Sequence, residues 1–192
     1  MTNRIKFAAA DGSKTNFGIA IMELDLDSLE ISVLDLILTK TEKSKNKQVR
    51  ASSDNLERAQ AVASPIPAAL KDCVCCFVEV PSGGQSYDAV LGFGIVIGIY
   101  ACIEGMLGVQ TLEVSPSETK LAAVGTKQAS KQEMIEWATE KFPDAPWRAH
   151  RGKPTLDNEH LADAVAIGFA GIKTTAFKSM LAMLRASSRK AA

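Results

Sequence analysis

The first forty residues hold three short apolar stretches separated by polar segments rich in turn-forming residues. Residues 5–9 and 17–24 flank the sequence DGSKTN at 11–16, and a third stretch follows at 29–38. Short apolar runs that are bounded by Gly, Ser, Asn and Asp are typical of β-strands joined by tight loops. The pattern therefore predicts that the chain opens with three consecutive antiparallel strands.

Helices and strands alternate in the remainder of the chain. The spacing of Asp54 and Glu57 predicts a capping box at a helix start, and the apolar run at 73–80 predicts a strand that is covered on both faces. We further expect a helix over 86–107, a short strand over 111–114, helices that start near 115 and 130, a loop over 145–154 and a last helix from about 157 that runs well past 169. This order predicts an α/β fold: a mixed five-stranded sheet with helices on both faces.

The most apolar segment is residues 89–103, which Glu104 interrupts. A membrane span needs roughly 20 apolar residues, so this segment is interpreted as a buried helix, with Gly94 and Gly98 spaced for close packing. The first ten residues lack the pattern of a secretion signal. The four cysteines have no zinc-binding spacing and are expected to be reduced thiols. Together these features predict a cytoplasmic protein without a membrane segment.

The chain has 192 residues, with 22 basic and 22 acidic side chains. This length suits one domain with a full hydrophobic core. A net charge of zero argues against a protein that coats polyanions, so any contact with nucleic acid must be local.

Three acids lie at positions where a solvated acid is not expected. Asp11 ends the first strand, Glu79 ends the most apolar strand, and Asp163 has small or apolar neighbours in the last helix. A carboxylate that faces a core is costly unless it is paired or bound to a cation. His160 precedes Asp163 by three residues, which places both on one face of that helix.

Each of these residues has a simpler interpretation when it is taken singly. Asp11 would only start a turn, Glu79 would only end a strand, and His160 would only lie in a first helical turn. Their occurrence together, in this order at strand and helix ends, favours a shared cation site. Carboxylate oxygens suit Mg²⁺ or Mn²⁺, and two such ions about 4 Å apart support phosphodiester hydrolysis.

Four motifs in this order resemble those of the RuvC-like Holliday junction resolvases, especially the phage-type members. They are residues 7–21 around Asp11, residues 77–86 around Glu79, residues 114–131, and residues 160–167 with His160 and Asp163. The resemblance covers residues 5–169. It implies an RNase H-like nuclease domain, taken as residues 1–170, followed by a basic helical tail at 171–192.

The resemblance also implies a function in DNA recombination and repair: a homodimeric, Mg²⁺-dependent endonuclease that nicks Holliday junctions or related branched DNA. Asp11 would contact both of two metal ions, and Glu79 and Asp163 would each help to hold one. Mn²⁺ is expected to substitute for Mg²⁺. His160 would be a metal ligand or would orient the attacking water. Because a histidine must be neutral to bind metal, activity is expected to fall below about pH 6.5.

Cellular members of the family carry an aromatic residue shortly after the second acid, where it contacts bases at the junction centre. In this chain the first aromatic residue after Glu79 is Tyr87. The expectation is therefore a broader range of branched DNA substrates.

Several small or basic residues near the predicted site are candidates for phosphate contacts. Backbone N–H groups before a helix bind phosphate, and lysines contact the DNA backbone without reading sequence. The candidates are Ser13, Gly83, Gly84, Gln85, Ser86, Lys120, Lys127 and Lys131. The basic segments at 40–50 and 148–153 are weaker candidates and are interpreted first as solvated loops.

Two other functions compete with a nuclease. The first is a non-catalytic module of the same fold that binds branched DNA and recruits a partner. The second is an RNase H-fold phosphotransferase, which is disfavoured because the chain is too short for two lobes and lacks phosphate-binding loops.

Overall fold

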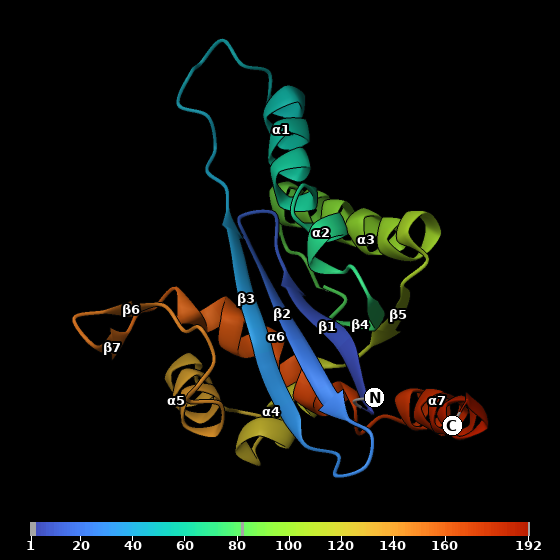
Figure 1. Cartoon of the computed structure of the whole chain (residues 1–192). Helices are drawn as coiled ribbons and strands as arrows, with labels where there is room; N and C mark the ends of the chain where they lie inside the picture. The colour runs from blue at the N-terminus through green and yellow to red at the C-terminus, as the bar shows by residue number, and fades with distance from the viewer. Residues whose placement is uncertain (1–2, 82, 192) are drawn as a thin grey trace.

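The computed structural model describes residues 3–81 and 83–191, and a five-stranded sheet in the order β3–β2–β1–β4–β5 forms its centre (Figure 1). The strands are β1 (Arg4–Gly12), β2 (Asn16–Asp25), β3 (Ile31–Lys40), β4 (Cys73–Val78) and β5 (Gln110–Glu113). β1 pairs antiparallel with β2, and β2 with β3, whereas β4 runs parallel to both β1 and β5. The predicted antiparallel trio and mixed sheet are confirmed.

Helices cover both faces of the sheet, as predicted. They are α1 (Ala51–Ala63), α2 (Ile66–Ala69), α3 (Tyr87–Leu107), α4 (Pro116–Val124), α5 (Lys131–Lys141), α6 (Asn158–Gly171) and α7 (Thr175–Ala191). On one face Ala8 and Ala10 pack with side chains of α1, α2 and α3. On the other face Phe7 and Ala9 pack with α6 and α7. Strand alternation therefore divides the apolar residues of β1 between two cores.

Helix α3 differs from the sequence-based expectation because it is only partly buried. Gly92, Val96, Tyr100 and Ile103 form its one buried face. The opposite face is exposed, and a Cβ atom on Gly94 or Gly98 would meet no atom within 4 Å, so the predicted close packing is absent within the described chain. By length and composition, α3 is the one described helix that could cross a membrane. Only 22% of its most apolar 18-residue stretch is buried inside the structure.

Two of the predicted helix starts are confirmed and one is wrong. Ser115 and Ser130 each form a full capping box with the glutamate three residues later. Helix α1 instead begins at Ala51 without a side-chain cap. Asp54 lies inside this helix, where its carboxylate accepts a hydrogen bond from the backbone N–H of Ser44 at 2.8 Å. The acid therefore ties down the preceding loop instead of starting the helix.

The predicted last helix is in fact two helices, α6 and α7. The break follows Gly171, and the Thr174 hydroxyl accepts a hydrogen bond from the N–H of Phe177, which caps the start of α7. Phe177 is fully buried, with its ring centroid 5.3 Å from that of Phe77. The first turn of α7 thus belongs to the core, while the division of the chain at residue 170 stays a prediction. The loop before α6 contains a short hairpin, β6 (Ala149–His150) and β7 (Lys153–Pro154).

Candidate active site

Two of the predicted acids lie side by side at one edge of the sheet. Asp11 is the penultimate residue of β1, and Glu79 directly follows β4. The two strands are parallel, and Ala10 of β1 pairs with Val78 of β4. Asp11 is the residue after Ala10, and Glu79 is the residue after Val78, so the two carboxylates lie at neighbouring positions. Parallel pairing therefore brings together two residues that are 68 positions apart in the sequence.

Helix α6 brings the other two predicted residues to the same edge. The His160 Nδ1 atom lies 2.7 Å from the Asp11 Oδ2 atom. This approach requires a glycine on β2, because a Cβ atom on Gly18 would lie 2.4 Å from the backbone oxygen of His160. Gly18 pairs with Asp11 in the sheet, so the same glycine sets the separation between strand and helix.

The charges of the four side chains act on one another. Burial and the charge of Asp11 raise the pKa of Glu79 to about 7, against a smaller lowering effect from Lys120. Burial and Asp11 also raise the pKa of Asp163 to about 7, partly offset by His160. The hydrogen bond to Asp11 raises the pKa of His160 above its ordinary value, against burial. These shifts are those expected of carboxylates that are partly buried and crowded together.

The donor atoms suit a hard divalent cation, since three carboxylates and one imidazole belong to one electrostatic cluster. Within residues 3–81 and 83–191, however, no three His, Cys, Asp or Glu side chains are spaced as in a complete metal site. The backbone thus brings the predicted ligands to one place, while the side chains do not form a closed coordination shell.

The predicted DNA-contacting lysines lie at different distances from this cluster. Lys120 on α4 and Lys131 at the start of α5 both interact electrostatically with its acids. The Lys131 ammonium also forms an ion pair with Glu159 at 2.5 Å. Lys127 lies exposed in the connection between α4 and α5.

The other predicted contacts lie in the turns that follow the two acidic strands. The Ser13 hydroxyl bonds the backbone of Asn16 and closes the β1–β2 turn. Ser86 is the N-cap of α3, and its hydroxyl accepts a hydrogen bond from the N–H of Ala89 at 3.2 Å. Gly83, Gly84 and Gln85 form the connection that leads from β4 to this cap. Tyr87 is 83% exposed in the first turn of α3.

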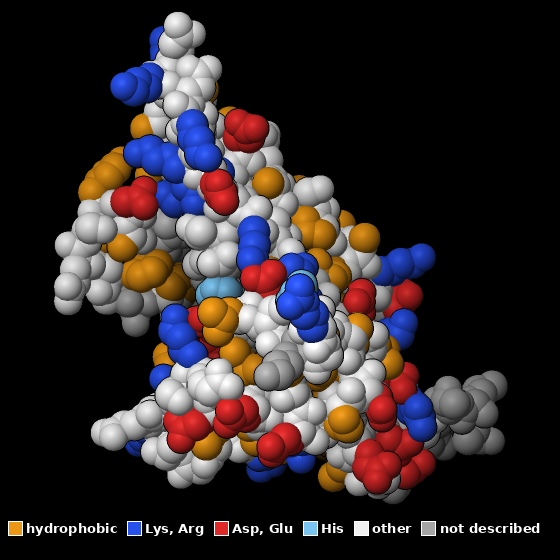
Figure 2. Space-filling model, turned by 90° about the vertical axis from the view of Figure 1, so that its left-hand side faces the viewer, with side chains coloured by type: hydrophobic (Ala, Val, Ile, Leu, Met, Phe, Trp, Pro, Cys, Tyr) orange, Lys and Arg blue, Asp and Glu red, His pale blue; other side chains and the backbone are white. Residues whose placement is uncertain are grey.

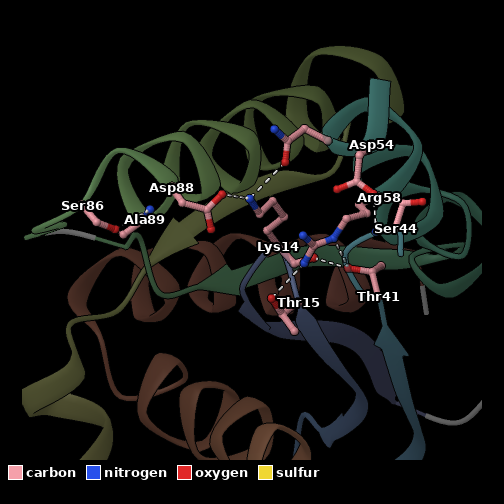
Figure 3. Close-up of polar contacts among 10 residues, drawn as sticks. Lys14, Thr15, Thr41, Ser44, Asp54, Arg58, Ser86, Asp88 and Ala89 are labelled. Carbon is pink, nitrogen blue, oxygen red and sulfur yellow. Dashed lines mark hydrogen bonds and ion pairs between the residues drawn. The ribbon is translucent and has the colours of Figure 1, made fainter. Parts of the chain in front are cut away.

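Sequence reasoning missed a buried polar network beside this site (Figure 3). Lys14 is only 6% exposed, and its ammonium donates to Asp88 at 2.6 Å and to Asn55 at 3.0 Å. The Arg58 guanidinium, also buried, donates to the hydroxyls of Thr41 and Thr15. These residues lie in polar stretches of ordinary composition, so no periodicity distinguished them from solvated side chains.

Tyr100 of α3 was also missed, because it lies within an apolar helical run. Its hydroxyl donates to the carbonyl of Ala10 at 3.3 Å. Burial and the charge of Asp11 raise its pKa well above the ordinary value for tyrosine. The buried side chain therefore contacts β1 at the residue directly before Asp11.

The arrangement of strands and helices is that of the RuvC-like form of the RNase H-like fold. The RuvC of Thermus thermophilus in complex with a Holliday junction substrate has a TM-score of 0.62 and 19% sequence identity, covering 87% of this chain and 91% of that one. The RuvC structure of Thermus thermophilus gives a TM-score of 0.61 at 19% identity, covering 93% and 96%. The Fowlpox virus resolvase in complex with Holliday junction DNA gives 0.53 at 12% identity, covering 92% and 99%.

No family model matches the sequence, and no curated protein matches it. The structural likeness covers most of each chain, which confirms the predicted fold class. At these identities the likeness concerns the fold, and the activity must be argued from the residues of this chain.

Proposed function

We propose that this protein is a metal-dependent endonuclease that nicks Holliday junctions or related branched DNA. The observation that carries the proposal is the convergence of Asp11, Glu79, His160 and Asp163 at one edge of a RuvC-like sheet. The solved structures with this fold include two resolvases described in complex with Holliday junction DNA.

In this proposal the three carboxylates would hold two Mg²⁺ ions, for which Mn²⁺ would substitute. Bound divalent ions would activate water and stabilise the leaving oxygen of the phosphodiester. Asp11 lies between Glu79 and the α6 residues, which suits the predicted role of contacting both ions. The hydrogen bond to Asp11 fixes the ring of His160 and directs its Nε2 atom away from that carboxylate.

The protein's own groups would also position the DNA. Lys120 and Lys131 supply positive charge beside the acids and would hold the phosphates next to the cut. Lys127, Ser13 and the segment 83–86 would contact the strand further out, partly through backbone N–H groups before α3. Contacts of this kind recognise shape and charge, which fits nicking that depends on branch structure.

The protein is further proposed to act as a homodimer in the cytoplasm, with the exposed face of α3 as the interface. Val90 is 56% exposed and Ile97 45% exposed. Gly94 lies between them and Gly98 directly follows Ile97, and both glycines leave room for a second helix to approach closely. A second copy of α3 would cover this apolar surface. The dimer would then carry two active sites, each of which could nick one of two opposite DNA strands.

The test is a synthetic mobile four-way junction incubated with Mg²⁺. We expect symmetric nicks of opposite strands by the wild type, and no nicking but retained binding by Asp11→Asn and Glu79→Gln. Asp72→Asn is the matched control, because Asp72 is exposed and has a φ of 65°, which asparagine tolerates.

Nicking that survives either active-site substitution would contradict the assigned site. Binding of the junction without nicking by the wild type, in Mg²⁺ and in Mn²⁺, would favour the non-catalytic DNA-binding module instead.

A further inference from the structure

The segment from Lys40 to Arg50 projects from the same edge of the sheet as the candidate active site. Asp11 pairs with Gly18 on β2, and Gly18 pairs with Leu38 on β3, so β3 ends beside the acids. Beyond Lys40 the chain rises past the end of the sheet before it returns as α1 (Figure 1). We call residues 40–50 the basic spur.

The basic spur concentrates positive charge in a chain that is neutral overall. It holds five basic residues and one acid, out of 22 and 22, so the rest of the chain has a net charge of −4. Figure 2 shows Lys and Arg side chains gathered over this projection and continuing down the same face, where His side chains are visible. Positive side chains therefore occur both on the spur and lower on the same face, with some acidic side chains among them (Figure 2).

Most of this charge is unpaired. Lys43, Lys45, Lys47 and Arg50 are exposed, and none of them forms an ion pair with a residue in the described part of the chain. Only Lys40 is paired, with Asp157 just before α6. Like charges that are held close together repel one another, so this arrangement favours the binding of a polyanion from outside the protein.

The base of the spur is fixed to the turn that follows Asp11. The Thr41 hydroxyl donates to the carbonyl of Lys14 at 2.6 Å, and the Thr41 N–H donates to the carbonyl of Thr15 at 2.8 Å. Arg58 donates to the Thr41 hydroxyl at 2.9 Å, and Asp54 accepts from Ser44. A spur anchored in this way has a set direction relative to the active site (Figure 3).

The spacing of the lysines suits a DNA backbone. Lys43, Lys45 and Lys47 lie at alternate positions in the connection between β3 and α1, and all three are exposed. Several exposed positive side chains in one short segment can contact several phosphates of one DNA strand at once.

We propose that the basic spur binds the phosphates of a duplex arm beyond the cleavage point and thereby sets the direction in which the DNA enters the site. This inference rests on the proposed function, since it assumes that the acids act on DNA. The spur would add affinity without sequence preference, because it carries lysines that contact phosphates and no aromatic side chain.

The experiment compares K43Q/K45Q/K47Q with the control K6Q/K71Q/K178Q, whose lysines are also exposed. Lys6 and Lys71 lie at the opposite edge of the sheet, and Lys178 lies on α7. Both triple variants are made in the Asp11→Asn background, and binding to a four-way junction is measured by fluorescence anisotropy between 50 and 200 mM salt.

We expect the spur variant to lose affinity by on the order of tenfold or more, and its slope of log K against log salt to become shallower by up to about 2.7. The control should change neither quantity appreciably. On a junction with arms too short to reach the spur, the spur variant and its parent should bind equally.

Equal affinity and equal salt slopes on long arms would overturn the proposal and would leave an acidic protein as the partner to seek. A loss that is the same on short and long arms would also overturn it, because the contact would then lie at the branch point. Nicking by the otherwise wild-type protein is measured in parallel. Failure of nicking counts against the proposed function, whereas failure of the arm-dependent binding difference counts against the spur alone.

Discussion

At the scale of single residues, the candidate site depends on one contact between a strand and a helix. His160 reaches Asp11 because α6 lies directly against β2 at Gly18. Any side chain at position 18 would meet the backbone of the helix, which cannot rotate away as a flexible side chain can. The hydrogen bond between histidine and aspartate is therefore sensitive to a residue that bears no reactive group.

We predict that Gly18→Ala lowers activity more than stability. The added Cβ atom would lie 2.4 Å from the His160 carbonyl and would push the start of α6 outward. Overpacking of this kind costs about 1–3 kcal/mol in stability, and a displacement near 1 Å costs on the order of a hundredfold in rate. Thermal unfolding and nicking rates measure the two effects.

Gly92→Ala is the control for this prediction. An added Cβ atom there would lie 3.6 Å from the Lys14 side chain, which is an ordinary contact, and alanine favours the helix. Full nicking by Gly18→Ala would show that the position of His160 does not matter to the reaction.

At the scale of elements, the sequence predicted the sheet and the acids better than the surfaces of the helices. The apolar stretches of β1, β2 and β4 are buried in the core. The carboxylates at the ends of β1 and β4 are adjacent because these two strands are parallel. Alternation and end positions are local properties of the chain, so the pattern of residues was enough to predict both.

Helix α3 shows where local pattern fails. An apolar helix that is buried in a core and one that binds another molecule through an exposed face have the same composition. Only the packing in the structure shows that one face of α3 is exposed. The helix start predicted at Asp54 failed for a similar reason, because this acid bonds the distant N–H of Ser44. Both errors concern contacts that the sequence does not encode locally.

The exposed face of α3 carries a prediction about assembly. Ile97→Glu should convert a dimer into a monomer, because it would bury a charge in each half of the proposed interface. Sedimentation velocity or light scattering measures the change. Nicks should then no longer be paired between opposite strands.

Leu56→Glu is the matched control, since Leu56 is 60% exposed on α1 and lies outside the proposed interface. A protein that is already monomeric before substitution, at concentrations that support paired nicking, would contradict the interface.

At the scale of the whole molecule, the acids that suit a metal weaken the metal-free fold. The pKa values of Glu79 and Asp163 are both raised to about 7, so the folded protein holds protons that the unfolded chain releases above about pH 4. Stability therefore falls as the pH rises from about 4 through 7. The raised pKa of His160 acts in the same direction. The stabilisation that protonated His160 gives the folded protein is complete below about pH 6.5 and is lost as the pH rises through the higher pKa that His160 has in the folded protein.

We predict that the metal-free protein melts at a lower temperature at pH 8 than at pH 6, and that Mg²⁺ or Mn²⁺ restores more stability at pH 8. A divalent cation binds the ionised carboxylates and neutral imidazole, so it must displace fewer protons at the higher pH. The same protonation would reduce nicking at a pH somewhat higher than the 6.5 of a free histidine, because Asp11 stabilises the imidazolium. Melting curves with and without metal, at both pH values, measure the first effect.

The double variant Glu79→Gln, Asp163→Asn separates this explanation from a general effect of pH. Neutral amides hold no titratable proton, so the metal-free variant should keep only the part of the pH dependence that His160 contributes between pH 6 and pH 8, and added Mg²⁺ should stabilise it little. A variant that keeps the full pH dependence would show that the loss of stability arises elsewhere in the molecule. The crowding of Glu79 and Asp163 would then not explain the loss of stability at high pH. The melting data would also no longer support these two carboxylates as metal ligands.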